Sequence, residues 1–110
     1  MIRPTLEEAR GWMGFRVDDV YGGSIGKLED VLVDADGRPS WLLVRERRVA
    51  GRRRRTLVPF EHATAGAGRI WVPYEREVVR TAPRVDADLQ LTEQHEARFR
   101  EHYRLEGSAT

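Results

Sequence analysis

Cysteine is absent from this chain of 110 residues, which excludes a disulfide framework, a thiolate metal site and a cysteine nucleophile. Long apolar runs are absent too. The longest uninterrupted run, Trp41 to Val44, has four residues, whereas a membrane-spanning helix needs about 18 or more. The first eight residues contain two acids and no hydrophobic signal core. We therefore expect a cytoplasmic protein without an integral membrane segment.

Lysine is nearly missing, since Lys27 is the single lysine among 19 basic residues. Because 18 acidic residues oppose them, the formal net charge is +1, which taken alone argues against a polyanionic partner. The charge is unevenly distributed, however. Residues 38–55 contain eight arginines and one acid, Glu46, and so carry a local charge of +7.

Six of these arginines fall within nine residues, at the tip of an expected hairpin: Arg47, Arg48, Arg52, Arg53, Arg54 and Arg55. Such dense like charge repels itself unless anions or acids oppose it. The candidate partners are an acidic protein surface, RNA or DNA phosphates, anionic lipid headgroups, and acids of the chain's own tail within a dimer. A solvated basic hairpin without a partner is the alternative. Aromatic residues do not interleave with these arginines, which argues against base stacking by this segment.

Short segments rich in β-branched and aromatic residues alternate with turns along most of the chain. They predict strands at residues 15–21, 25–34, 40–48, 54–60 and 69–74, and helical turns near residues 5–10 and 75–80. Some strands are apolar on both faces, which suits strands covered on the outside by a helix or by a second copy. The pattern predicts a mainly β fold: a small antiparallel β-barrel of five to six strands with a short C-terminal helix.

A domain boundary is expected near Pro83, between a barrel domain of residues 1–84 and a linker and tail of residues 85–110. Thr92 can cap a helix that runs to about Tyr103. One narrow stripe along it carries Leu91, His95, Phe99 and either His102 or Tyr103. This stripe is too poor to sustain an isolated helix in water. Through Leu91, Phe99 and Tyr103 the helix must dock on the barrel, meet a partner or fray.

Several residues have predicted structural roles in turns and bends. Gly23 permits a tight turn, Gly26 a kink or bulge, and Gly37 a hairpin turn with positive φ after Asp34. Asp30 interrupts an apolar strand, so we expect its carboxylate to accept backbone or Arg hydrogen bonds at a bend. Pro59 cannot donate to a ladder and belongs at an edge, a bulge or a strand end, while Pro83 stops a helical turn.

These segments, in this order, resemble the PRC-barrel domain family over roughly residues 8 to 84. The resemblance rests on the glycines and acids of residues 11–19, on Gly23-Ser-Ile-Gly-Lys-Leu-Glu-Asp-Val-Leu-Val-Asp34, on residues 57–60 and 70–74, and on Ala82-Pro83. It implies a small β-barrel that serves as a docking module rather than an enzyme. The family includes the cytoplasmic part of the reaction-centre H subunit, part of a bacterial ribosome-maturation factor and archaeal cell-division adaptors. The membrane anchor of the first and the additional N-terminal domain of the second have no counterpart in this sequence.

Three short motifs allow chemical interpretations that the sequence disfavours. Residues 22–26 match the Gly-x-Ser-x-Gly pattern of hydrolases, but expected strands flank them on both sides. His95-Glu96 begins a zinc motif whose second histidine is replaced by Phe99. Asp34-x-Asp36-Gly37 resembles part of a calcium loop without its first and last ligands. We therefore expect no catalytic residue, no metal ligand, no cofactor and no small-molecule substrate.

Two functional hypotheses follow. The first is a non-enzymatic interaction or adaptor module, a homodimer that docks on an unidentified acidic or anionic protein partner through the Arg-rich hairpin. The alternative is an RNA- or ribonucleoprotein-binding protein that uses residues 47–55.

Overall fold

The computed structural model describes residues 4–46, 54–85 and 91–104. Within these ranges, short helices flank and cover a β-sheet. The elements, in chain order, are α1 (Leu6–Arg10), β1 (Arg16–Asp18), β2 (Ser24–Val33), β3 (Pro39–Glu46), β4 (Arg55–Pro59), β5 (Thr64–Gly66), β6 (Arg69–Trp71), α2 (Arg76–Arg80) and α3 (Glu93–His102).

The described strands form one sheet in the order β4-β3-β2-β1-β6-β5. Neighbours are antiparallel except β1 and β6, which run parallel. The mainly β fold is confirmed, but the predicted antiparallel arrangement is wrong. The long return from β4 brings β6 beside β1 in the same direction, instead of as the next hairpin partner. Among the described residues, β4 and β5 remain as edges, so strand pairing does not close the sheet into a barrel.

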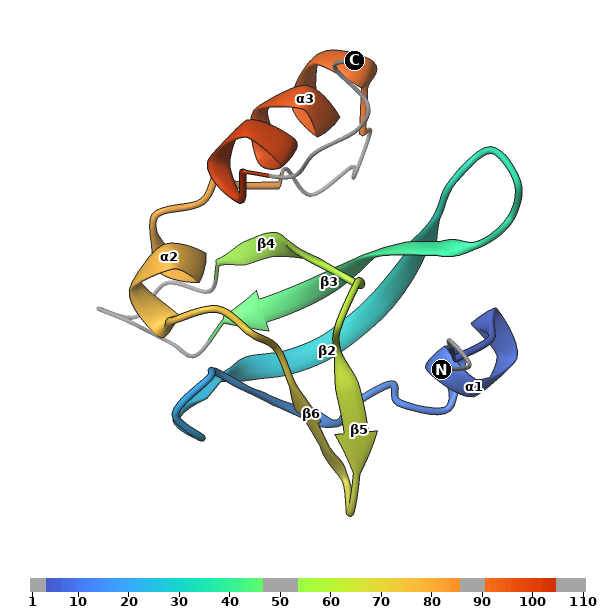
Figure 1. Cartoon of the computed structure of the whole chain (residues 1–110), viewed down its shortest axis with the longest axis vertical. Coiled ribbons are helices and arrows are strands. Elements are labelled where there is room, and N and C mark those ends of the chain that lie inside the picture. Colours follow the sequence, from blue (N-terminus) through green and yellow to red (C-terminus); the bar gives the residue numbers. More distant parts are fainter. Residues whose placement is uncertain (1–3, 47–53, 86–90, 105–110) are drawn as a thin grey trace.

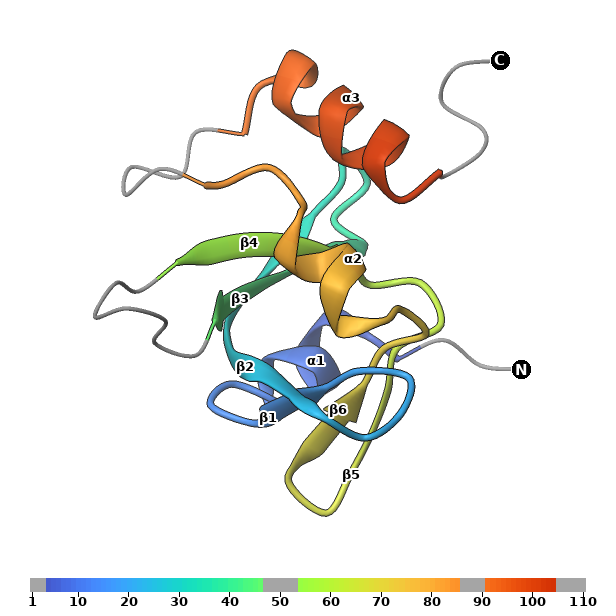
Figure 2. The same cartoon turned by 90° about the vertical axis from the view of Figure 1, so that its left-hand side faces the viewer.

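The sheet is strongly twisted, and its two ends differ (Figures 1 and 2). In both views α3 lies at the top and the β5–β6 hairpin of the sheet at the bottom. Strand β5 is not predicted from the sequence, because Thr64–Gly66 contains no large apolar side chain. The helical turn near residue 5 is confirmed: the Thr5 side chain caps α1 by accepting a bond from the Glu8 N–H.

Gly26 lies where β2 and β3 approach most closely. A Cβ atom at this position would lie 2.2 Å from the carbonyl oxygen of Arg45, so only glycine fits. The pairing register shifts beside it, between Val17 and Asp18 of β1. The predicted bulge is therefore confirmed, and the approach of the neighbouring backbone explains why the residue is glycine.

Two acids predicted to bond the backbone do so. The register shifts between Leu28 and Asp30, and there the Asp30 carboxylate accepts a hydrogen bond from the Val31 N–H at 2.8 Å. In the β2–β3 turn, the Asp34 carboxylate accepts one from the Asp36 N–H at 2.8 Å, and Gly37 has a φ of 78°. The calcium-like motif is thus a turn held by its own aspartate.

Pro59 ends the edge strand β4, as its missing N–H predicts. The outer edge of β4 is occupied by other groups of the chain. The Val85 N–H donates to the Arg55 carbonyl at 3.1 Å, and the Tyr103 hydroxyl donates to the Leu57 carbonyl at 2.9 Å. Because these acceptors are taken, the edge offers little to a further strand.

The apolar run of β3 is buried along its whole length, from Trp41 to Val44. Since side chains alternate between faces, both faces of β3 are covered here. Helix α3 covers one of them: the Trp41 and Phe99 ring centroids lie 5.7 Å apart, and Trp41 Nε1 donates to Glu96 Oε2 at 3.2 Å. The sequence allowed a helix or a second copy as the outer cover of such a strand, and on this face of β3 the cover is a helix of the same chain.

Candidate anion-binding surface

The start of β4 places two of the six clustered arginines beside acids of neighbouring strands. Arg55 Nη2 lies 3.0 Å from Glu29 Oε1 on β2, and Arg54 Nε lies 3.6 Å from Glu46 Oε2 at the end of β3. Arg54 Nη2 also donates to the carbonyl oxygen of Arg80, the last residue of α2, at 3.1 Å. Both guanidiniums are thus held by groups of the chain itself. The other four, Arg47, Arg48, Arg52 and Arg53, lie outside the described residues.

Glu46 is a half-buried acid with several cations around it. Burial raises the pKa of this carboxyl above its usual 4.5, while Arg54, Arg80 and Arg84 oppose the rise. Three guanidiniums therefore act electrostatically on one half-buried carboxyl group, and Arg80 also pairs with Glu77. This corner of the molecule keeps an excess of positive charge.

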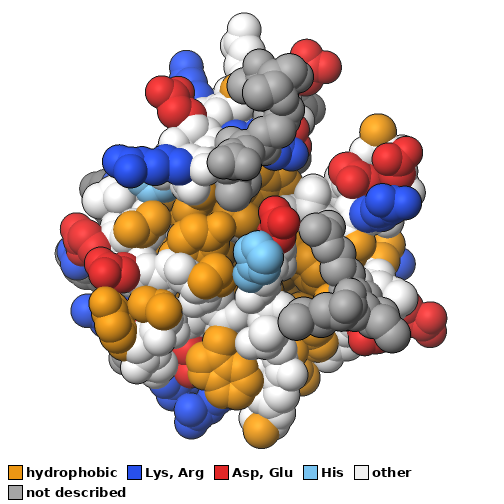
Figure 3. All heavy atoms as spheres, in the orientation of Figure 1, with side chains coloured by type: hydrophobic (Ala, Val, Ile, Leu, Met, Phe, Trp, Pro, Cys, Tyr) orange, Lys and Arg blue, Asp and Glu red, His pale blue; other side chains and the backbone are white. Residues whose placement is uncertain are grey.

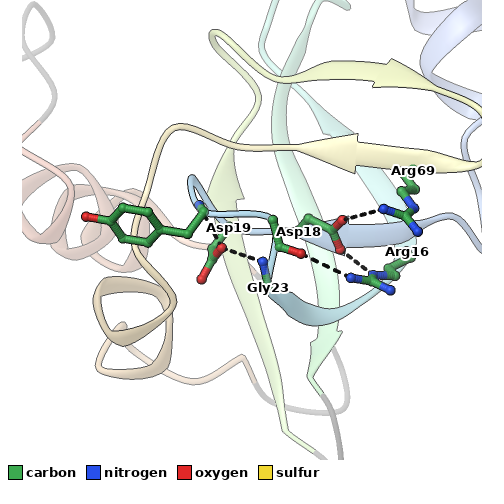
Figure 4. A network of polar contacts seen from close by, with 7 residues as sticks. Arg16, Asp18, Asp19, Gly23 and Arg69 are labelled. Carbon is green, nitrogen blue, oxygen red and sulfur yellow. Dashed lines mark hydrogen bonds and ion pairs between the residues drawn. The ribbon is translucent and has the colours of Figure 1, made fainter.

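Asp18, the last residue of β1, is completely buried between two arginines (Figure 4). Its Oδ1 lies 2.5 Å from Arg16 Nε, and its Oδ2 lies 3.9 Å from Arg69 Nη1 on β6. Arg16 Nη2 also donates to the Gly22 carbonyl at 3.1 Å. A buried carboxylate requires such partners, because desolvation disfavours its charge. One acid thus positions two guanidiniums, whose side chains remain 40% and 49% exposed.

The β1–β2 turn is fixed by the neighbouring acid, Asp19. Its Oδ1 accepts hydrogen bonds from the Tyr21 N–H at 2.9 Å and from the Gly23 N–H at 2.7 Å (Figure 4). The Tyr21 side chain is 78% exposed, and its hydroxyl donates to Glu75 Oε1 at 3.1 Å. This bond to Glu75 raises the tyrosine pKa. The turn predicted at Gly22-Gly23 is therefore held by side-chain hydrogen bonds and presents an aromatic side chain.

The predicted docking residues of the tail all contact the sheet domain. Phe99 and Tyr103 belong to the core, and Leu91 packs against it. The Tyr103 ring lies 4.8 Å from that of Tyr74, and burial raises the Tyr103 pKa. His102 Nε2 donates to the Val78 carbonyl at 2.6 Å. Of the three outcomes open for this helix, docking on its own chain is the one observed.

One face of the molecule shows how side-chain types are separated (Figure 3). In the orientation of Figure 1, hydrophobic side chains gather in the middle of this face and Lys and Arg side chains lie around its periphery. A pocket of about 190 Å³ lies near the α3 end of the sheet, with Trp41, Phe60 and Arg100 among its lining residues. Sites for drug-sized ligands usually occupy about 300–1,000 Å³. The pocket is therefore small for that role.

Comparison with known proteins identifies the fold family. A family model of the PRC-barrel domain matches residues 7–79, which are 73 of the 110 residues. The chain belongs to the PRC-barrel domain family. A search of curated proteins found no match. Family membership supports a generic interaction module and names no partner.

In this PRC-barrel domain, the serine motif and the histidines singled out in the sequence do not lie in the arrangements that catalysis or metal binding requires. Ser24 of the Gly-x-Ser-x-Gly pattern begins β2, so it does not occupy the strand-to-helix elbow that hydrolases use. His62 is exposed on the β4–β5 connection, and His95 is exposed on α3. Within the described ranges, no group of three or more His, Cys, Asp or Glu side chains could hold a metal ion. None of the helices described is long and apolar enough to span a membrane.

No local sequence pattern identifies the arginine pair of the PRC-barrel sheet. Arg16 and Arg69 are separated by more than 50 residues, and neither lies in an arginine cluster. They meet only because β1 and β6 pair in parallel, with Arg16 directly beside Arg69. Pairing between distant strands cannot be deduced from local sequence spacing.

Proposed function

We propose that this PRC-barrel chain is a non-enzymatic adaptor that docks on an anionic partner through the Arg-rich connection between β3 and β4. The observation that carries the proposal is the anchoring of Arg54 and Arg55. Glu46, at the end of β3, and Glu29 of β2 already form ion pairs with these two residues. The positive charge of Arg47, Arg48, Arg52 and Arg53 therefore has to be balanced by other acids of the chain, by solvent ions or by a partner.

Heparin, a generic polyanion, tests this proposal. The wild-type protein should elute from a heparin column at a clearly higher salt concentration than the variant R47Q/R48Q/R52Q/R53Q, which leaves the anchored pair intact. The variant R10Q/R38Q/R98Q/R104Q loses the same charge at exposed positions elsewhere and serves as the matched control. Failure of the wild-type protein to bind heparin at low salt, or equal losses in both variants, would contradict the proposal.

A homodimer is a further part of the proposal that the sequence favours. The sequence favours a dimer because some strands are apolar on both faces and the stripe of the tail helix is poor. In the structure, however, α3 covers one face of β3 within a single chain. The remaining support is the exposed apolar tip of the β1–β2 turn, where Val20 and Tyr21 are 51% and 78% exposed. Light scattering after size-exclusion chromatography decides the point. A monomer at high micromolar concentration would contradict the proposed homodimer.

The cytoplasmic location stays a prediction from the sequence.

A further inference from the structure

The register of the sheet aligns five basic residues that are far apart in the sequence. Arg55 of β4 lies opposite Arg45 of β3, which lies opposite Lys27 of β2. Lys27 lies opposite Arg16 of β1, which lies beside Arg69 of β6. The sixth position of this row, on β5, is Gly66. Since Lys and Arg are 19 of the 110 residues, five basic side chains among six positions exceed what composition alone would give.

Directly paired residues of a sheet point to the same face, so this basic row lies on one face of the sheet. Its members are exposed or partly exposed, whereas the residues that alternate with them, such as Val17, Leu28 and Ile70, are buried. With strands about 4.8 Å apart, the row extends roughly 19 Å along the sheet from Arg55 to Arg69.

The basic row keeps an excess of positive charge. Arg55 contacts Glu29, and Arg16 and Arg69 share Asp18. The two central members, Lys27 and Arg45, contact no acid among the residues that the structure describes. Like charges directly opposite one another destabilise a sheet. An arrangement that reduces stability in the free protein is expected where an anion outside the chain compensates for it.

An aromatic ring adjoins one end of the row. Trp71 follows Arg69 by two residues, with buried Ile70 between them, and is therefore on the same face. Its ring lies over β5, because a Cβ atom on Gly66 would meet Trp71 Cζ3 at 3.9 Å. The ring is partly exposed. The sequence of residues 47–55 contains no aromatic residue, whereas the basic row has Trp71 on the same face of the sheet.

We propose that the basic row and Trp71 bind a single strand of nucleic acid, with phosphates along the cations and a base stacked on the indole. The proposal rests on the proposed function and names the class of its anionic partner. Proteins that bind single strands combine a positive track for the backbone with aromatic rings for the bases. A stacked strand advances by about 3.4 Å along the helix axis for each phosphate, and an extended strand advances by more. Several phosphates therefore fit along a row of roughly 19 Å. A carboxylate side chain, unlike a base, has no ring to stack on the indole.

Fluorescence anisotropy with a labelled 12-nucleotide oligouridylate tests the proposal. The Kd should rise steeply with salt. The variant K27Q/R45Q, which removes the two central cations, should weaken binding roughly 50-fold at 50 mM salt and flatten the salt slope by about 1.4, at ~0.7 per phosphate contact. The matched control R38Q/R98Q removes two exposed arginines away from the row and should weaken binding less than about threefold. Unfolding midpoints of both variants establish that they fold.

The variant W71L distinguishes nucleic acid from an acidic protein. Stacking on an aromatic side chain contributes about 1–3 kcal/mol per base. The oligouridylate affinity of W71L should therefore fall at least about fivefold, while the affinity for a 12-residue polyglutamate stays unchanged.

Other outcomes separate this proposal from the proposed function. Binding of polyglutamate without oligouridylate overturns the nucleic-acid partner and leaves the adaptor intact. A third outcome concerns the basic row itself. If K27Q/R45Q leaves oligouridylate binding unchanged while R47Q/R48Q/R52Q/R53Q abolishes it, the nucleic acid does not bind to the basic row. Absence of binding to either probe at low salt contradicts both proposals.

Discussion

One face of strands β3 and β4 differs at its two ends. At one end, Trp41 is buried under Phe99 of α3, and the Tyr103 hydroxyl reaches the backbone of β4. At the other end, Arg45 and Arg55 lie opposite each other and extend into the basic row. Side chains alternate between the two faces along the whole length of these strands. The two ends therefore differ because α3 covers one of them and not the other. Aromatic packing against α3 lies at the covered end, and the basic residues lie at the open end.

The largest expected effect comes from removing the cover. F99A deletes a fully buried ring between α3 and Trp41 and should lower the free energy of unfolding by about 4 kcal/mol. Urea denaturation measures this loss, with F99L as the milder control. The oligouridylate Kd of folded F99A should change less than about twofold. A large loss of affinity in folded protein would show that the two ends are not independent.

The second effect lies on the sheet beside the basic row. G26A would place a Cβ atom 2.2 Å from the Arg45 carbonyl oxygen, so β2 and β3 must move apart. We expect a destabilisation of about 3 kcal/mol, the upper part of the range for overpacking, and weaker oligouridylate binding because Lys27 and Arg45 shift. An unchanged unfolding midpoint would mean that the strands are not in contact as described.

A smaller effect tests one hydrogen bond at the covered end. Y103F removes the hydroxyl that donates to the Leu57 carbonyl and leaves the ring against Tyr74. The expected loss is about 1 kcal/mol, the usual contribution of such a bond. Denaturation of Y103F beside the wild-type protein measures it, and a gain in stability would contradict the assigned bond.

The smallest effect is a pH dependence at the open end. Because burial raises the pKa of Glu46 above 4.5, the folded protein binds this proton more tightly than the unfolded chain does. The resulting stabilisation is complete below pH 4.5 and is lost as the pH rises through the raised pKa. The stability of the wild-type protein relative to E46Q should therefore fall across that window, as measured by denaturation at several pH values. A relative stability that increases with pH there would reverse the assignment.

Local features of the fold could be predicted from the sequence. The Thr5 cap of α1, the Asp34–Gly37 turn and the start of α3 after Thr92 each depend on a few adjacent residues. The family resemblance identified the domain, and the docking stripe identified Phe99 and Tyr103.

Features that depend on distant pairing could not be predicted. The parallel contact of β1 with β6 and the close approach at Gly26 are set by the register of strands far apart in the chain. For the same reason, the sequence directs attention to the cluster at residues 47–55, whereas the row also includes isolated cations such as Lys27 and Arg69. Composition cannot show which basic residues become neighbours.

The most direct test of the separation between the two ends is a nuclear magnetic resonance titration of the labelled protein with oligouridylate. We expect shifts of the Trp71 indole and of the backbone amides of Arg16, Lys27, Arg45, Arg55 and Arg69, with little change at Phe99 and Tyr103. Shifts concentrated on α3 and the covered end of β3, with the row unaffected, would contradict it.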